Sequence, residues 1–136
     1  MSNATRIGAL VALVAINACG GGGSNPTGPS GPVVSSTGSV GTIGATITIS
    51  NGAVNPSSVT ISAGQSVRFV NSDGRSHDMS SDPHPSHTNC PSMANVGLLS
   101  ANQTKDSFGF AGAGSCGFHD HNDPDNNSLK GRITIQ

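Results

Sequence analysis

The stretch that decides the fold is Thr42-Ile43-Gly44-Ala45-Thr46-Ile47-Thr48-Ile49. Its apolar residues occupy every second position, and threonines fill three of the positions between them. A period of two places the apolar side chains on one face of an extended chain and the threonines on the other face. The stretch therefore predicts a β-strand with one buried face.

The same alternation recurs along the chain, at Val59 and Ile61 and again across residues 67–70. Further strands are expected at residues 96–99, 108–110 and 132–136. No apolar period of 3.6 residues occurs after residue 40. Short strands separated by Gly, Pro and Asn turns predict an all-β protein built as an antiparallel β-sandwich.

The N-terminal segment indicates export. A single charge at Arg6 precedes an apolar run at residues 7–16, which is too short to span a bilayer and is typical of a signal peptide. Ile16-Asn17-Ala18-Cys19 resembles the lipobox of bacterial lipoproteins, in which the cysteine is lipidated. We expect a signal peptide at 1–18 and a lipid on Cys19. The alternative is an ordinary secretory signal followed by an unrelated cysteine.

Residues 19–39 are rich in Gly, Pro and Ser, a composition typical of a flexible tether. Residues 40–136 are long enough for one domain with a modest core. We therefore expect a domain held by a lipid anchor to a membrane of the cell envelope, in the periplasm or outside the cell. The net charge of −1 and the absence of a basic patch argue against a nucleic-acid partner.

The side chains that bind metals are concentrated in the domain. All five histidines and all seven aspartates lie between Asp73 and Asp125, and the chain contains no Glu. His77, Cys116 and His119 supply two imidazoles and one thiolate, the donor set of a copper site that carries single electrons. Between His77 and Cys90 the chain is polar and contains two prolines, which predicts a loop with a function of its own.

Two longer stretches carry a family resemblance. They are Asn55-Pro56-Ser57-Ser58-Val59-Thr60-Ile61-Ser62-Ala63-Gly64-Gln65-Ser66-Val67-Arg68-Phe69-Val70-Asn71, followed by His77, and Cys116-Gly117-Phe118-His119, followed by residues 129–135. Together they resemble the cupredoxin domain of plastocyanin-like and azurin-like proteins. The resemblance implies a Greek-key β-sandwich with copper at one end, in which His77, Cys116 and His119 are the ligands.

Other residues extend or alter this expected site. Leu129 stands where the resemblance implies an axial methionine, and Met79 or Met93 is a candidate replacement. His121 shares a face with His119 if the segment is extended, as a ligand or as a neighbour of the site. His84 and His87 are either solvated loop residues or part of a second, weaker copper site.

Cys90 leaves two mechanisms open. If Cys90 forms a disulfide with Cys116, copper meets only imidazoles and the protein is a non-blue copper binder. If Cys90 stays free or binds the metal itself, the Cys116 thiolate binds copper.

The expected function is therefore a one-electron carrier with a redox protein partner in the envelope. The alternative is a copper-handling lipoprotein that uses a His-rich site. Neither is an enzyme, because the sequence has no nucleophile elbow and no Glu to act in acid–base chemistry.

Overall fold

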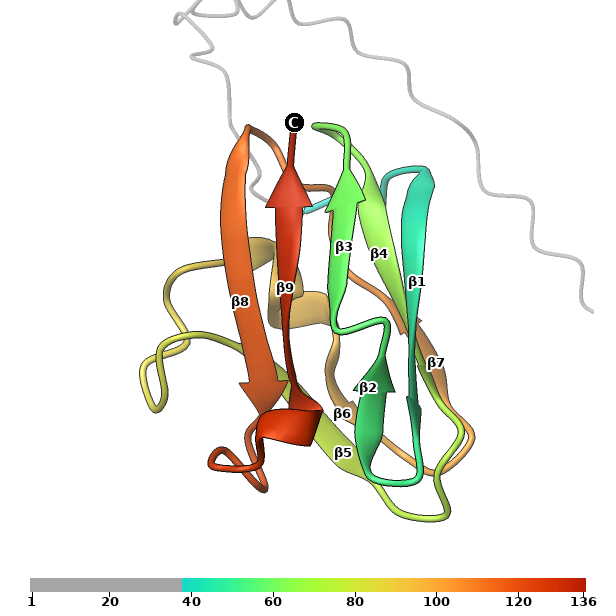
Figure 1. The fold of residues 1–136 in the computed structure, drawn as a ribbon. Helices are drawn as coiled ribbons and strands as arrows, with labels where there is room; N and C mark the ends of the chain where they lie inside the picture. The colour runs from blue at the N-terminus through green and yellow to red at the C-terminus, as the bar shows by residue number, and fades with distance from the viewer. Residues whose placement is uncertain (1–37) are drawn as a thin grey trace, which may run out of the picture. The chain divides into compact units, whose positions relative to one another are not determined.

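A computed structural model describes residues 38–136, which form a β-sandwich of two sheets (Figure 1). The predicted signal peptide, the lipidation of Cys19 and the tether up to residue 37 lie outside the described residues. Within residues 38–136, no helix is long and apolar enough to cross a membrane. The sequence-based prediction of a β-sandwich is confirmed.

The first sheet has the strand order β2-β1-β4-β7 and the second has the order β3-β9-β8-β5-β6. The strands are β1 (Ile43–Ser50), β2 (Ala53–Asn55), β3 (Ser58–Ile61), β4 (Ser66–Asn71), β5 (His77–Ser81), β6 (Gly97–Leu99), β7 (Thr104–Asp106), β8 (Gly114–Asp120) and β9 (Lys130–Ile135). Two short 3₁₀ helices, η1 (Pro91–Asn95) and η2 (Asn127–Leu129), join them. Both sheets are mixed, because the pairs β1–β4 and β3–β9 are parallel and the other pairs are antiparallel.

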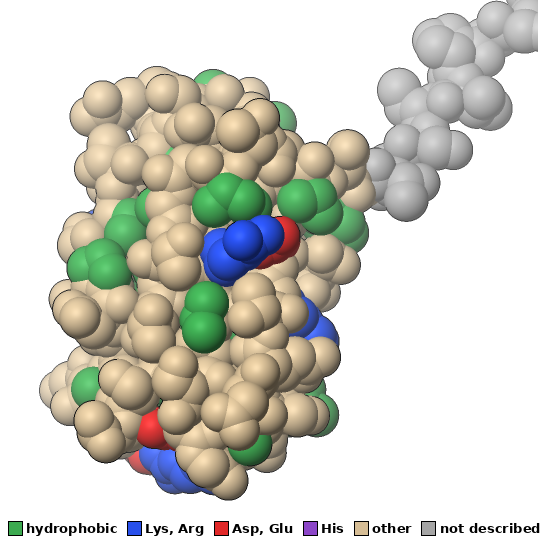
Figure 2. Space-filling model, turned by 90° about the vertical axis from the view of Figure 1, so that its right-hand side faces the viewer, with side chains coloured by type: hydrophobic (Ala, Val, Ile, Leu, Met, Phe, Trp, Pro, Cys, Tyr) green, Lys and Arg blue, Asp and Glu red, His purple; other side chains and the backbone are tan. Residues whose placement is uncertain are grey.

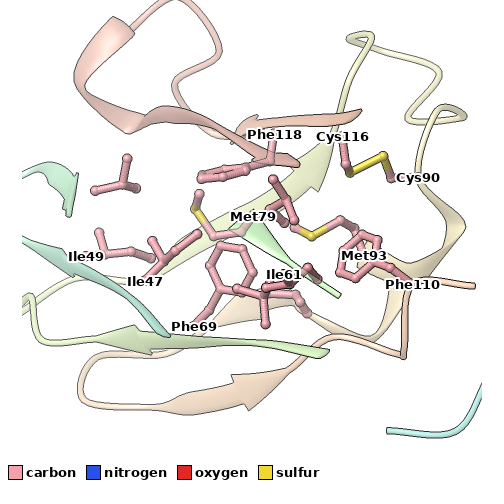
Figure 3. Close-up of a cluster of buried hydrophobic side chains, with 14 of the residues drawn as sticks. Ile47, Ile49, Ile61, Phe69, Met79, Cys90, Met93, Phe110, Cys116 and Phe118 are labelled. Carbon is pink, nitrogen blue, oxygen red and sulfur yellow. A yellow bond between two sulfur atoms is a disulfide. The ribbon is translucent and has the colours of Figure 1, made fainter. Parts of the chain in front are cut away.

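The core lies between the two sheets and follows from the alternation in the sequence. Ile47 and Ile49 of β1 and Phe69 of β4 are fully buried, as the period of two requires. Phe69 meets Phe118 of β8 edge to face, with ring centroids 5.4 Å apart. Figure 3 shows these side chains packed around Met79, with the Cys90–Cys116 disulfide at one end of the cluster.

Three local predictions differ from the structure, and the first concerns residues 108–110. This segment is not a strand, and the strand that pairs with β4 is β7, at Thr104–Asp106. The N–H groups of Phe108, Gly109 and Phe110 donate to carbonyl groups of three separate segments, at residues 92, 39 and 65. No single neighbouring strand therefore continues the ladder.

The other two differences concern the predicted metal site. His77 does not precede a loop, because residues 77–81 form β5, with His77, Met79 and Ser81 buried. Cys116 and His119 both belong to β8, a strand that the alternation in the sequence did not predict. The polar loop is confined to residues 82–90, here called loop 82–90.

Figure 2 views the side of the molecule that carries β1, β4 and β7. Apolar and charged side chains are scattered on this face, and most of it is uncharged polar groups and backbone. Arg68 and Asp106 form a paired contact there, with N···O distances of 2.8 and 3.0 Å. The guanidinium of Arg68 lowers the pKa of Asp106, despite the opposing effect of burial.

Candidate metal centre

Four imidazoles gather on the outer side of the second sheet. Their ligand atoms, one from each of His84, His87, His119 and His121, all lie within 4.8 Å of one another. Two of the rings come from loop 82–90, and two come from the end of β8 and the residue after it. We call this group the four-histidine cluster.

His119 reaches the cluster because of its position in β8. Cys116 and Phe118 of this strand face the core, so alternation turns Gly117 and His119 to the opposite side. Nδ1 of His119 lies 2.8 Å from Oδ1 of Asp82. Because an ionised carboxylate only accepts hydrogen bonds, Nδ1 carries the proton, and Nε2 has a free lone pair in the neutral ring.

Nε2 of His119 is the strongest sign of a ligand. It is buried and has no hydrogen-bond partner among the described residues. Buried polar atoms are nearly always hydrogen-bonded, so an exception of this kind calls for an explanation such as an ion. A carboxylate on the far nitrogen of an imidazole is the arrangement that orients histidine ligands toward metals. The cluster therefore fits a metal ion that binds neutral nitrogen donors.

Gly117 makes room for the Asp82 carboxylate. A Cβ atom built on Gly117 would overlap this carboxylate, so any larger residue would displace it. The backbone N–H of Asp82 donates to the Gly117 carbonyl over 2.9 Å, which fixes the start of loop 82–90 against β8. Gly117 thus helps to orient His119, because it leaves space for the Asp82 carboxylate that binds the His119 ring.

His87 is held in an unusual backbone conformation. Its φ of 51° lies in the left-handed region, which few residues other than glycine adopt. Its backbone N–H donates to the Pro83 carbonyl over 2.8 Å, and its Nδ1 donates to the Ser81 carbonyl over 2.7 Å. With Nδ1 protonated, Nε2 of His87 also presents a lone pair to the cluster.

His121 completes this arrangement. Its Nδ1 lies 2.8 Å from Nε2 of His87. Because the His87 proton is on Nδ1, the Nδ1–H of His121 donates this hydrogen bond, which a metal ion bound between the two rings would replace. Its backbone N–H donates to the Asp78 carbonyl over 2.7 Å, which ties the turn after β8 to β5. The expectation that His119 and His121 point to the same side agrees with their membership of one cluster.

His84 is the most exposed ring of the four. No described residue makes a hydrogen bond to its nitrogen atoms. Partial loss of water contact and the neighbouring imidazoles of His121, His119 and His87 lower its pKa, and Asp125 opposes this shift. The ring therefore stays neutral at pH 7, the form that binds a metal.

Cys90 and Cys116 form a disulfide in this structure, with their Cα atoms 5.9 Å apart. The bond joins the residue at the end of loop 82–90 to β8, three residues before His119. Because the Cys116 sulfur is bonded to another sulfur, it is not a thiolate, and the prediction of Cys116 as a thiolate ligand is corrected. The disulfide instead anchors the loop that carries His84 and His87.

His77 lies away from the cluster and has a different environment. The ring is fully buried, with Nδ1 2.7 Å from Oδ2 of Asp120 and Nε2 3.0 Å from Oδ2 of Asp73. Burial raises the pKa of Asp73, but hydrogen bonds from the Gly52 N–H, from His77 and from the Asn51 N–H lower it overall. Both ring nitrogens of His77 are thus occupied by carboxylates.

The structure does not bring His77, Cys116 and His119 together. Cys116 and His119 are three residues apart in one strand, so their side chains point to opposite faces of the sheet. The ladder pairs Met79 with Asp120, so His77 lies beyond the end of β8, and Cys116 lies four residues before that end. At about 3.3 Å per residue, this separates the two by roughly 20 Å along the strands. The three predicted ligands therefore do not form one site in this structure.

The remaining candidate ligands belong to the core. Met79, Met93 and Leu129 are buried, and Figure 3 shows both methionines among the core side chains. Met79 and Met93 line a cavity of about 170 Å³ that His87 also borders. Leu129 has an aliphatic side chain with no atom that can bind a metal. Leu129 is the last residue of η2 and is fully buried.

Sequence reasoning missed three residues that build the site, namely Asp82, Gly117 and Asp120. Asp120 is buried, and its Oδ1 accepts hydrogen bonds from the N–H groups of Asp78 and Asn122. It thereby fixes the turn that carries His121. A signal was present in the spacing of Asp82, His84 and His87, which places a carboxylate and two imidazoles within six residues.

Comparisons with known proteins support the fold. No protein-family model matches the chain, and a search of curated proteins finds no significant relative. An oxidised amicyanin mutant superimposes with a TM-score of 0.54 at 15% identity, covering 68% of this chain and 82% of that one. A purple cupredoxin from Nitrosopumilus maritimus has a TM-score of 0.53 at 19% identity, covering 68% and 99%. Amicyanin from Paracoccus versutus has a TM-score of 0.50 at 19% identity, covering 68% and 81%. The described domain therefore has the cupredoxin fold.

Proposed function

We propose that this protein binds copper at the four-histidine cluster and handles the ion in the cell envelope. The single observation that carries the proposal is Nε2 of His119, a buried nitrogen that has no hydrogen-bond partner within residues 38–136 and belongs to a cluster with three other imidazoles. The metal is the cargo of such a protein. Its residues bind, hold and release the ion, and they catalyse no reaction.

Copper is the metal that this donor set favours. Imidazoles suit copper, zinc, iron and nickel, and among the divalent ions of the first row copper binds most tightly to a given site. Nitrogen–metal distances near 2.0–2.1 Å require the widest separations in the cluster, up to 4.8 Å, to shorten and the 2.8 Å contact between His87 and His121 to open slightly. Rotation of the side chains on loop 82–90 supplies such a movement. One ion fills the cluster, and a second site is not part of the proposal.

A one-electron carrier is the second candidate function. The likeness to amicyanin and to a purple cupredoxin favours it, although identities of 15–19% extend that likeness to the fold alone. A carrier needs a redox protein partner, as expected from the sequence. Cyclic voltammetry of the copper-loaded protein separates the candidates, because a carrier gives a fast, reversible wave and a handling protein releases the ion on reduction.

The location in the envelope is a further part of the proposal. The apolar run at residues 7–16, the lipobox-like sequence ending in Cys19 and the Gly-rich segment after it support a lipid anchor. The disulfide supports an oxidising compartment, where such bonds persist. Membrane fractionation of the wild type and of Cys19→Ser tests it, since the variant should move to the soluble fraction.

Two matched variants test the binding site. His119→Gln and His77→Gln each replace a buried histidine that contacts an aspartate, but only His119 belongs to the cluster. Native mass spectrometry with added Cu²⁺ should find one copper per chain in the wild type and in His77→Gln, and none in His119→Gln at the same concentration. Circular dichroism checks that both variants fold. Loss of copper in a folded His77→Gln, with retention in His119→Gln, would refute the proposed site.

A further inference from the structure

The four imidazoles of the cluster are not held equally. Asp82 orients His119, the Ser81 carbonyl orients His87, and the backbone contact with Asp78 ties down His121. His84 has no hydrogen bond to its ring from the described residues and is exposed to solvent. A ligand that lacks such support has more freedom to leave the ion, because nothing fixes its orientation.

A cleft opens beside this ring. It has a volume of about 620 Å³ and is bordered by His84 and His119 together with Asp125 and Lys130. A donor group that enters the cleft can therefore approach the cluster from the side of His84. By contrast, His119 is 2% exposed, and Asp82 covers the far side of its ring.

We infer that His84 is the exchangeable ligand of the cluster, and that an external nitrogen donor takes its place from the cleft. The ion stays bound to His87, His119 and His121 while the external donor replaces His84 as the fourth ligand. The incoming group is an imidazole or a similar neutral donor, which binds through one nitrogen lone pair. Exchange of this kind lets the molecule that receives the copper bind the ion before this protein releases it. The inference rests on the proposed function.

Rescue by free imidazole tests the inference. The full-length protein, His84→Ala and His119→Ala are each titrated with Cu²⁺, and copper affinity is measured with and without added imidazole. We expect His119→Ala to lose more than the roughly 10- to 100-fold that is typical when only the supporting partner of a ligand is removed, and His84→Ala to lose less than His119→Ala. Imidazole should restore the affinity of His84→Ala and leave that of His119→Ala unchanged, because the His84 position is exposed to solvent whereas the His119 position is buried, although both side chains border the cleft.

The outcomes distinguish failure of the proposed copper binding from failure of the exchangeable role of His84. If the wild type binds no copper, the proposed function fails. If the wild type binds copper but His84→Ala is as weak as His119→Ala, or imidazole rescues both variants or neither, the exchangeable role of His84 is refuted. The paramagnetic resonance spectrum of copper in His84→Ala gives an independent readout, since imidazole should shift it toward the wild-type spectrum.

Discussion

Asp82 should set the copper affinity of the site although it does not belong to the four-histidine cluster. Its carboxylate accepts a hydrogen bond from the Nδ1–H of His119 over 2.8 Å and so orients Nε2 toward the other rings. Removal of such a partner typically lowers metal affinity 10- to 100-fold. Because the Asp82 side chain is 48% exposed, water partly replaces it, and we expect the lower end of that range. Asp82→Ala should therefore lose about tenfold, or about 1.4 kcal/mol of binding free energy.

Gly117→Ala provides a control that leaves Asp82 in the chain. A methyl group at this position overlaps the carboxylate, so it should displace Asp82 and reproduce the loss. Isothermal titration with Cu²⁺ measures each variant and the double variant. If both single changes act on one contact, the double variant should be no weaker than either. Losses that add would refute the reasoning, and so would an Asp82→Ala protein with wild-type affinity and an unchanged fold.

Three further predictions concern stability and the core. Replacement of both Cys90 and Cys116 by Ser should lower the free energy of unfolding by about 3–4 kcal/mol, because the disulfide closes a loop over a sequence separation of 26. Denaturant titration measures this loss, and a value below about 1 kcal/mol would contradict the prediction. The pKa of Asp73 is lowered in the folded state, so the unfolded chain binds its proton first and stability falls as the pH drops below about 4. Asp73→Asn should flatten that part of the stability profile, and an unchanged acid limb would count against the role of this carboxylate. Phe118→Ala should cost about 3–5 kcal/mol by thermal or chemical unfolding, because its ring is 1% exposed and packs against Phe69; a change within 1 kcal/mol would be inconsistent with that packing.

The sandwich could be predicted from the sequence because it depends on a local signal. Alternation places Ile47 and Ile49 on one face whatever lies opposite, and the same holds for Phe69. The local structure of residues 108–110 could not be predicted from alternation, since their backbone hydrogen-bond partners come from three distant segments. The parallel pairing of β1 with β4 also depends on contacts that no local pattern reveals.

The structure brings together only some of the predicted metal ligands, for reasons of strand geometry. His119 belongs to the cluster, and His121, His84 and His87 were named as further candidates. The order of His77, Cys116 and His119 suggested a shared site, but order does not determine the face on which a side chain lies. Cys116 and His119 lie in one strand, three residues apart, and their side chains therefore point to opposite faces of the sheet. The choice between a thiolate and a disulfide required the position of Cys90.

The visible absorption spectrum of the oxidised, copper-loaded protein tests the central claim most directly. A copper–thiolate bond produces intense charge-transfer colour, whereas copper bound only by imidazoles is pale. With Cys90 and Cys116 joined, and with four imidazoles as ligands, the account predicts a weakly coloured complex containing one copper per chain. An intense blue or purple complex that bleaches in Cys116→Ser would contradict it and would return the site to a thiolate.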